Sequence, residues 1–312
     1  MAVLVYFAAG AANWQEYRDL LPAACADLGL EVVVSDREPD PALVDYIIFA
    51  PGGVVSDFSP FTRCKAVLSL WAGVEKYAGN PTLTQPLARM VNHELTERMV
   101  EYVVGHVLRH HLGMDAHITG QDGVWRNDVM PPLARERPVT VLGLGELGRA
   151  CAQALAALHF PVTGWSRRAK VLPGVDCMSG QDGLGTALAR AAIVVCLLPQ
   201  TAETVDILDA RRLAMLPRGA TIINPGRGAL IEDAALLAAL DSGQVGHATL
   251  DVFRIEPLPP DHPYWAHPRV TVTPHVAADT RAGSAARVLA ENIRRSEAGE
   301  PLLHLVDRAR GY

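Results

Sequence analysis

One local pattern restricts the fold of this chain more than any other, a G-x-G-x-x-G motif between an apolar run and an amphipathic stretch. The run Val-Thr-Val-Leu fills positions 139–142, and the three glycines follow it. In a strand–turn–helix unit, the first glycine permits the tight turn, the second lets the backbone approach a pyrophosphate, and the third allows helix and strand to pack closely. Amides at the start of the helix then bind phosphate oxygens. The residues predicted to bind a dinucleotide here are Gly143, Gly145, Glu146, Leu147 and Gly148.

Apolar runs of strand length alternate with helical patterns on both sides of this motif, and such alternation predicts parallel sheets. The strands predicted before residue 95 cover residues 3–7, 31–35, 46–50 and 66–70. The later ones cover residues 139–142, 161–165, 192–198, 221–224, 247–252 and 270–273. The second series makes a complete doubly wound sheet. A glycine-rich turn that binds nothing is therefore the weaker interpretation of the motif.

The length of 312 residues favours two domains. We predict a Rossmann-type α/β cofactor domain at residues 96–282 and a smaller, flavodoxin-like α/β substrate domain at residues 1–95 and 283–312. Helical patterns cover residues 13–28, 94–111 and 283–297. The second of these helices, with the polar loop at residues 121–137, is predicted to bridge the two domains.

Composition excludes several classes of partner. With 49% hydrophobic residues, 20% charged residues and a net charge of -6, the chain is an ordinary globular protein without a basic surface for nucleic acid or an anionic membrane. Its five cysteines are dispersed, without a C-x-x-C pair, and no basic residue precedes the apolar start. No apolar stretch reaches the roughly 18 to 20 residues of a membrane span. We therefore expect a cytoplasmic protein with reduced thiols and a small-molecule partner.

The residues after the strand at 161–165 indicate which dinucleotide is bound. An NAD enzyme places a carboxylate about 20 residues after the glycines to accept both ribose hydroxyls. This chain has Ser166, Arg167 and Arg168 there. A hydroxyl and two guanidinium groups bind a 2′-phosphate, so NADPH is the expected cofactor, preferred over NADH. The alternative is a solvated turn, which two consecutive arginines often form.

Three later segments carry a possible reaction centre: residues 224–228, 250–259 and 273–278. Reduction of a 2-oxo acid needs a cation for the carboxylate and carbonyl oxygens, and an acid for the developing alkoxide. Arg227 is the candidate cation, His275 the acid, and Glu256 the group that orients the imidazole. Each has a structural alternative: a helix-cap ion pair, a core histidine and a surface charge, respectively. Their order after a dinucleotide motif favours catalysis.

These residues resemble the D-isomer-specific 2-hydroxyacid dehydrogenases along nearly the whole chain, and most of all the bacterial glyoxylate and hydroxypyruvate reductases of the A type. The resemblance is carried by the ordered Arg, Glu and His and by Trp165-Ser-Arg167, Leu197-Leu-Pro199 with 201–204, Glu256-Pro-Leu-Pro259 and the tail from Val306 to Tyr312. It implies hydride transfer from the nicotinamide C4 to C2 of a small 2-oxo acid such as glyoxylate or hydroxypyruvate. It further implies that Arg227 anchors the substrate and that His275 donates the proton.

The same resemblance implies further site residues and an assembly. The implied residues of the cofactor pocket are Leu198, Pro199, Thr204, Pro225, Gly226 and Asp251. Backbone amides of a glycine-rich loop grip the substrate carboxylate, and the matching residues are Trp71, Ala72 and Gly73. Trp71 replaces a small residue, so its indole either narrows the pocket or, as we expect of a single tryptophan, packs in the core. Phe49 has the same two alternatives. A homodimer joined through the cofactor domain is also implied.

Two other classes of function stay open at this point. The same family contains dinucleotide-sensing transcriptional corepressors, and it contains sister dehydrogenases for formate, phosphoglycerate or bulkier hydroxy acids. The complete Arg–Glu–His set favours an enzyme over a sensor. His106 and His110 lie four residues apart, with His111 adjacent, but the sequence supplies no third ligand at a recognisable spacing. We assign these histidines to structure and expect no metal.

Overall fold

The computed structural model describes residues 2–125, 127, 130–308 and 311, and it divides into two compact units. Unit 1 consists of Met1–Leu95 with Asp279–Tyr312, and unit 2 is Thr96–Ala278. The chain thus leaves unit 2 four residues before the boundary that we placed at 282/283. That placement followed the start of a helical pattern, and the short segment before the helix carries no periodic signal. Of the tail that contributes to the resemblance, residues 309, 310 and 312 lie outside the described residues.

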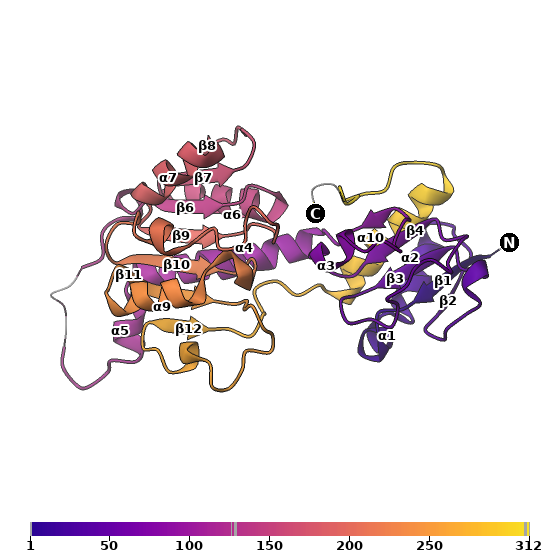
Figure 1. Ribbon diagram of the computed structural model, residues 1–312, viewed down its shortest axis with the longest axis horizontal. Coiled ribbons are helices and arrows are strands. Elements are labelled where there is room, and N and C mark those ends of the chain that lie inside the picture. Colours follow the sequence, from indigo (N-terminus) through magenta and orange to yellow (C-terminus); the bar gives the residue numbers. More distant parts are fainter. Residues whose placement is uncertain (1, 126, 128–129, 309–310, 312) are drawn as a thin grey trace. The chain divides into compact units, whose positions relative to one another are not determined.

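Unit 1 is a five-stranded parallel sheet in the order β2-β1-β3-β4-β5, which is the flavodoxin-like order (Figure 1). Its strands are β1 (Val3–Phe7), β2 (Val32–Ser35), β3 (Tyr46–Phe49), β4 (Ala66–Ser69) and β5 (Leu87–Ala88). Its helices are α1 (Ala11–Tyr17), α2 (Leu20–Asp27), the 3₁₀ turn η1 (Pro41–Leu43), α3 (Glu75–Ala78) and α10 (Ala282–Glu297).

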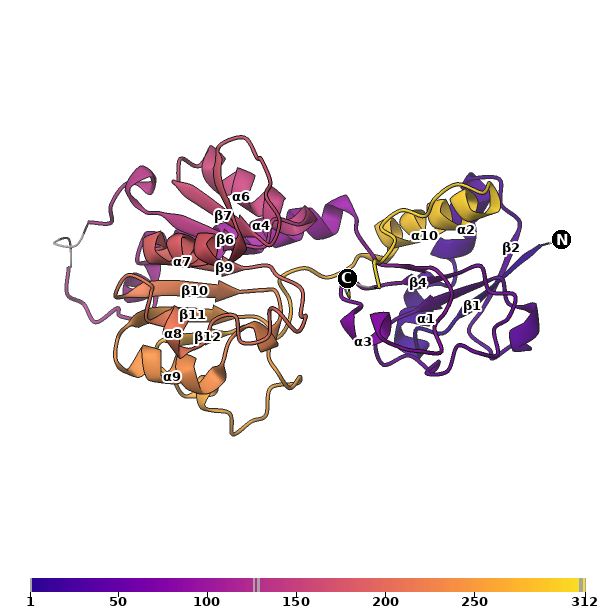
Figure 2. The ribbon, with the colours of Figure 1, turned by 45° about the horizontal axis from the view of Figure 1, so that its top comes forward.

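Helix α10 belongs to unit 1 although it lies far along the chain. Its buried side chains, among them Leu289 and Ile293, join one hydrophobic core with Leu21 and Cys25 of α2. Figure 2 shows α10 beside α2 on the same face of the sheet. The hydrophobic core of unit 1 is therefore built by the first ninety-five residues together with the apolar face of α10.

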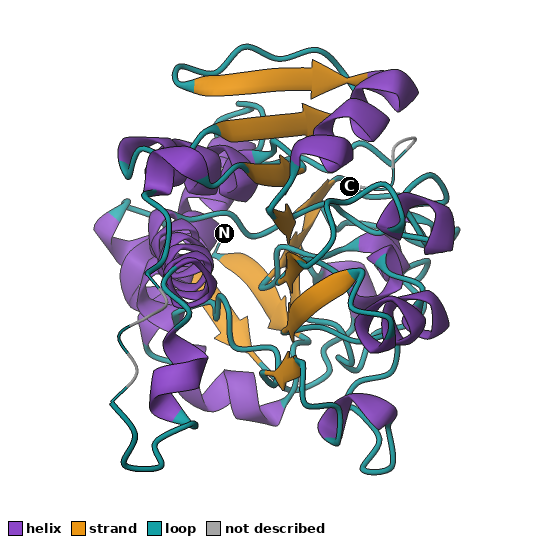
Figure 3. Cartoon of the chain, turned by 90° about the vertical axis from the view of Figure 1, so that its left-hand side faces the viewer, coloured by secondary structure: helices purple, strands orange, loops and turns teal. Residues whose placement is uncertain are grey.

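Unit 2 is a seven-stranded parallel sheet in the order β12-β11-β10-β9-β6-β7-β8, with helices on both faces (Figure 3). Its strands are β6 (Val139–Leu142), β7 (Val162–Ser166), β8 (Val175–Ser179), β9 (Ile193–Cys196), β10 (Ala220–Asn224), β11 (Val245–Leu250) and β12 (Val270–Val272). Its α-helices are α5 (Met114–Ile118), α6 (Glu146–Ala157), α7 (Gly180–Arg190), α8 (Ala210–Leu213) and α9 (Asp233–Asp241). Three 3₁₀ turns complete it: η2 (Ala134–Glu136), η3 (Gly228–Leu230) and η4 (Pro263–Trp265).

Helix α4 (His93–His111) begins in unit 1 and packs along unit 2. Met99, Val103 and Val107 lie in one core cluster with Val139 and Val141 of β6. The strand order reverses between β6 and β9, and in open α/β sheets ligands bind beyond the carboxyl ends of the strands at such a point. The topology therefore indicates a ligand site at the loops that follow these two strands.

The predicted strands are all present, but the structure corrects one predicted helix and adds two strands. The helix predicted at 13–28 is two helices, because Pro22 cannot occupy a helix interior and instead lies in the first turn of α2. Strands β5 and β8 were not predicted. β5 has two residues, and β8 lacks clean alternation because Asp176 and Ser179 interrupt its apolar side chains.

Thiols and helices give two further observations. All five cysteines are unpaired thiols, and Cys25, Cys64, Cys151 and Cys196 are buried. Burial raises the pKa of the Cys196 thiol to about 12, so this residue is inert, as expected. Within the described residues, no helix is both long enough and apolar enough to cross a membrane.

Candidate active site

The loop between β6 and α6 has the close contacts that the glycine motif predicts. A Cβ on Gly143, whose φ is 103°, would lie 2.5 Å from the Leu197 carbonyl oxygen. A Cβ on Gly148 would lie 1.8 Å from the Gly143 carbonyl oxygen. Both positions therefore require glycine, and the loop lies against the chain that leaves β9.

The remaining glycine faces open space. A Cβ on Gly145 would meet no atom within 4 Å, and Gly145 caps the twelve-residue helix α6. An open backbone in front of a helix N-terminus fits the pyrophosphate of a dinucleotide. Glu146, in the first turn of the helix, forms an ion pair with Arg149 at 2.7 Å. Leu147 packs partly against the core under β6.

The candidate ribose site lies at the end of β7. The buried Ser166 hydroxyl donates to the Arg168 carbonyl oxygen at 2.7 Å and so fixes the turn. Arg167 Nη1 lies 2.8 Å from Glu203 Oε2, both side chains being substantially exposed, and Arg168 is exposed as well. Lys170, which the sequence reasoning overlooked, donates to the Leu144 carbonyl oxygen inside the glycine loop. This end of the candidate site is cationic, with exposed guanidinium groups that suit a phosphate.

The turn after β9 is held by the buried Thr204. Its hydroxyl donates to the Pro199 carbonyl oxygen at 2.6 Å and accepts from the Thr201 amide at 2.8 Å. Leu198 is buried and Pro199 half-buried. Thr204 therefore shapes the wall that Leu198 and Pro199 form beside the glycine loop.

The segment after β10 presents Arg227. Asn224 fixes the turn, because its side chain donates to the Arg227 carbonyl oxygen at 3.0 Å and accepts from the Gly226 amide at 3.1 Å. Gly228 is required, since a Cβ there would lie 2.0 Å from the Phe253 carbonyl carbon. Pro225 and Gly226 are buried. Asn224 stood in the quoted motif, but only the structure shows its role.

Glu256 and His275 form a direct pair, although 19 positions separate them. His275 Nδ1 lies 2.8 Å from Glu256 Oε2, and Glu256 Oε1 accepts from the Phe253 amide at 2.8 Å. The hydrogen bond to Glu256 raises the pKa of His275 against the opposing effect of burial. Burial opposes ionisation of Glu256, but its hydrogen bonds with His275 and Phe253 outweigh that effect and lower its pKa. The contact therefore favours the charged forms of both groups, the imidazolium and the carboxylate.

Arg227 belongs to the same electrostatic environment. Its charge lowers the pKa of both Glu256 and His275, and its Nη1 donates to the Gly226 carbonyl oxygen at 2.6 Å. The structure thus brings together the cation, acid and orienting carboxylate predicted from three separate segments.

Asp251 lies beneath this centre and is completely buried. Its carboxylate accepts from the Thr273 hydroxyl at 2.6 Å and from the Val276 and Ala277 amides at 2.9 Å each. The family resemblance places Asp251 in the cofactor pocket. In this structure its carboxylate holds the loop that carries His275.

The predicted substrate loop follows β4 in unit 1. The Ser69 hydroxyl accepts from the Trp71 amide and donates to the Trp71 carbonyl oxygen, both at 3.0 Å. Trp71 is 45% exposed, so the expectation that its indole packs in the core is wrong. Ala72 and Gly73 are partly exposed. Phe49 is core, with its ring centroid 4.4 Å from that of Tyr77, so it does not wall a pocket.

The histidines of α4 are closer to metal-ligand geometry than their spacing suggested. Ligand atoms of His110, Asp115 and His247 lie within 4.8 Å of one another. Asp115 follows His110 by five residues across the turn between α4 and α5, whereas His247 comes near His110 only through folding. Arg109 Nε lies 2.6 Å from Asp115 Oδ1, so the Asp115 carboxylate is already paired with a guanidinium group. His106 and His111 are outside this group.

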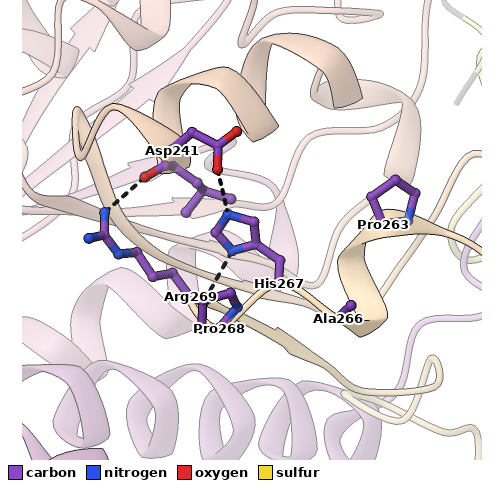
Figure 4. Close-up of a pocket in the computed structure, with 7 residues that line it drawn as sticks. Asp241, Pro263, Ala266, His267, Pro268 and Arg269 are labelled. Atoms are coloured by element: carbon purple, nitrogen blue, oxygen red, sulfur yellow. Dashed lines mark hydrogen bonds and ion pairs between the residues drawn. The ribbon is translucent and has the colours of Figure 1, made fainter.

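One hollow of unit 2 lies away from these candidate site residues. It measures about 440 Å³ and is lined by the end of α9 and residues 263–269 (Figure 4). His267 Nε2 lies 3.3 Å from Asp241 Oδ1, and Arg269 Nη1 donates to the Leu240 carbonyl oxygen at 2.8 Å. These contacts cap α9, and none of the predicted site residues lines the hollow.

A doubly wound sheet with a dinucleotide loop, and an arginine beside a Glu–His pair at the same edge, defines an NAD(P)-dependent dehydrogenase. The family model "D-isomer specific 2-hydroxyacid dehydrogenase, NAD binding domain" matches residues 103–277. The chain belongs to the D-isomer specific 2-hydroxyacid dehydrogenase family and is an NAD(P)-dependent oxidoreductase.

Two solved structures illustrate the similarity. A D-isomer specific 2-hydroxyacid dehydrogenase from Xanthobacter autotrophicus Py2, in complex with NADPH and MES, is 41% identical with a TM-score of 0.91, over 100% of this chain and 99% of that one. An NADPH-dependent glyoxylate/hydroxypyruvate reductase from Sinorhizobium meliloti, in complex with NADP and sulfate, is 35% identical with a TM-score of 0.86, also over 100% and 99%. The expected family and two-domain α/β fold are confirmed.

Replacement of Glu256 by glutamine tests the Glu–His pair. If His275 donates a proton, reduction needs the imidazolium, so activity falls as pH rises through the His275 pKa. Glu256→Gln removes the carboxylate that raises this pKa, and we expect the alkaline decline of kcat/KM to move to lower pH. The measurement is a pH–rate profile of both proteins. Glu297→Gln, a carboxylate of unit 1, is the control, and identical profiles for Glu256→Gln and wild type would disprove the pairing.

Proposed function

We propose that this enzyme uses NADPH to reduce a small 2-oxo acid, glyoxylate or hydroxypyruvate, to the 2-hydroxy acid. The observation that carries the proposal is the 2.8 Å contact between His275 and Glu256 at the edge where Arg227 and the glycine loop also lie. The reductase from S. meliloti, similar over the whole chain, supports this substrate class. Five dispersed cysteines suit a reducing compartment, and we place the reaction in the cytoplasm.

The residues divide the chemical work between them. Bound NADPH supplies the hydride that C2 of the substrate receives. Arg227 binds the carboxylate and carbonyl oxygens, so that negative charge developing on the carbonyl oxygen is stabilised. Glu256 holds Nδ1 of His275, which leaves Nε2 as the nitrogen that delivers a proton to this oxygen. Glu256 keeps its charge and stabilises the imidazolium before transfer.

We assign the loop of Trp71, Ala72 and Gly73 to the substrate carboxylate. The Ser69 hydroxyl fixes the loop through its hydrogen bond with the Trp71 amide. The half-exposed Trp71 indole limits the size of any substrate bound beside it. This fits two- and three-carbon acids better than aromatic ones. The assignment rests on the place of the loop after β4 and on the family resemblance.

A substrate panel tests the reaction. Wild type with NADPH should reduce glyoxylate and hydroxypyruvate with higher kcat/KM than pyruvate or phenylpyruvate, as followed by the loss of NADPH absorbance. Arg227→Ala should lower kcat/KM at least about a hundredfold on every substrate, because lost electrostatic stabilisation of a developing oxyanion costs that much. Cofactor affinity should change little.

The control for this panel is Arg190→Ala, which removes an exposed arginine paired with Asp176 at the far end of α7. It should behave as wild type. No turnover of any 2-oxo acid by wild type would overturn the proposed reaction. Near-normal kcat/KM in folded Arg227→Ala would remove Arg227 from the mechanism.

Preference for NADPH rests on the charges at the end of β7. Ser166, Arg167 and Arg168 stand where NAD enzymes place a carboxylate. The contact of Arg167 with Glu203 is exposed, and exposed ion pairs contribute only about 0 to 1 kcal/mol, so a phosphate can displace it. We also assign Lys170, which already contacts the glycine loop, to this cationic environment.

Exchange of these residues should reverse the cofactor preference. Wild type should favour NADPH by about tenfold or more, because charge-assisted hydrogen bonds contribute roughly 1.5 to 3 kcal/mol each. Ser166→Asp with Arg167→Ala should favour NADH, since the new carboxylate accepts from the ribose hydroxyls and repels the phosphate. We would measure kcat/KM for both cofactors in both proteins. Equal use of the two cofactors by wild type would mean that the arginines do not read the phosphate.

We further propose a homodimer joined through unit 2. Between residues 112 and 133, unit 2 exposes the large apolar side chains Leu112, Met114, Ile118, Val124, Trp125, Met130 and Leu133. Monomers rarely expose large contiguous apolar patches, and aromatic residues and methionine are enriched at interfaces. A second copy of the chain is the occupant that the family resemblance implies.

Trp125 is 89% exposed and is the residue to change. Trp125→Ala should shift the sedimentation coefficient from that of a dimer towards that of a monomer at low micromolar concentration. Trp265→Ala, in which the exposed indole lies elsewhere in unit 2, is the control and should stay dimeric. A monomeric wild type, or a Trp125→Ala dimer as stable as wild type, would contradict this interface.

A further inference from the structure

A chain of hydrogen bonds connects helix α4 to the loop of His275. The Tyr102 hydroxyl lies 2.8 Å from Thr273 Oγ1, and Thr273 Oγ1 lies 2.6 Å from Asp251 Oδ1. An ionised carboxylate only accepts, so the single hydroxyl hydrogen of Thr273 goes to Asp251. Tyr102 must then be the donor to Thr273. The direction of the chain is therefore fixed: Tyr102 to Thr273 to Asp251.

Asp251, the last residue of this hydrogen-bonded series, bonds to the backbone amides at and directly after His275. Asp251 accepts through its carboxylate from Val276 and Ala277, and through its carbonyl oxygen from the His275 amide at 2.9 Å. His275 has a φ of 55°, in the left-handed region that non-glycine residues avoid. Such a conformation persists only where the surroundings hold it. The bonds of Asp251 and Thr273 on both sides of His275 are the ones that hold it.

We propose that Tyr102 is a positioning residue for the proton donor: through Thr273 and Asp251 it keeps His275 in the conformation in which its imidazole contacts Glu256. Tyr102 itself touches neither His275 nor Glu256 in any contact that the structure gives. The proposal rests on the proposed reduction only for its kinetic readout, since the position of His275 is also measurable without substrate.

The surroundings of Tyr102 keep it a donor. Burial raises the pKa of Tyr102, and the charge of Asp251 raises it further, while the hydrogen bond with Thr273 and the charge of Arg109 oppose these effects. The ring also packs on His106 at a centroid distance of 4.4 Å, so removal of the hydroxyl alone leaves the ring in place. The groups that act on His275 are Glu256, Asp251 and Arg227.

Tyr102→Phe removes only the first hydrogen bond, and Thr273→Val removes the second as well. In Tyr102→Phe we expect kcat to fall about three- to tenfold, the range that corresponds to one hydrogen bond. KM for NADPH should stay within twofold of wild type. The double variant should lose no more than Thr273→Val alone, because both changes break the same chain. Thr273→Ser, which keeps the hydroxyl, should recover most of the kcat lost in Thr273→Val.

A second readout needs no turnover. The His275 pKa, followed by NMR of histidine-labelled protein, should fall in Tyr102→Phe, because a looser loop weakens the contact with Glu256. Tyr46→Phe is the matched control: its hydroxyl donates to Glu297 at 2.6 Å in unit 1, and its loss should change neither kcat nor this pKa.

The outcomes separate the two proposals. Wild type that reduces no 2-oxo acid refutes the proposed function, whereas a lower His275 pKa in Tyr102→Phe still supports the positioning role. An unchanged His275 pKa, together with kcat within twofold of an active wild type, refutes the positioning role alone. A lower melting temperature with unchanged kcat and unchanged His275 pKa would show that Tyr102 is merely structural.

Discussion

The buried carboxylate of Asp251 connects the later strands of the unit 2 sheet to the loops that carry the candidate catalytic residues. A charge taken out of water is unfavourable unless hydrogen bonds compensate it, and bonds to charged groups contribute roughly 1.5 to 3 kcal/mol each. Asp251 receives one from a hydroxyl and two from consecutive amides. Its own backbone pairs with Asn224 at the end of β10, so the Arg227 turn and the His275 loop meet at this residue.

The parallel sheet explains why residues so far apart in sequence share one edge. Every strand of unit 2 runs in the same direction, so the chain ends of β6, β7, β9, β10, β11 and β12 all open on that edge. The features that these loops bring to the edge are the glycine loop, the cationic turn, the wall at Leu198 and Pro199, the Arg227 turn and, from two loops together, the Glu256–His275 pair. The close approach of Gly143 to Leu197 and of Gly228 to Phe253 fixes neighbouring loops against each other.

Sequence reasoning succeeded where the determining information is local. The glycine-rich turn, the turn after β7 and the strand ends are each set by a few adjacent residues, so these elements could be located directly. It failed where a side chain depends on distant partners. The exposure of Trp71, the buried network of Asp251 and the approach of His247 to His110 arise from packing between elements that no spacing reveals. β8 was missed because its mixture of polar and apolar residues resembles the sequence of a loop.

The unequal burial of the thiols offers an experimental handle. A thiolate is the species that reacts with maleimides and iodoacetamide, and burial raises the pKa of Cys25 to about 11 and of Cys64 and Cys151 to about 12. Cys177 is only half-buried and lies on β8 opposite Gly164, two positions before the Ser166 turn along the paired strand. A fluorophore attached under mild conditions would therefore report from beside the turn that we assign to the adenosine end of the dinucleotide, in the native chain and without removal of any other cysteine.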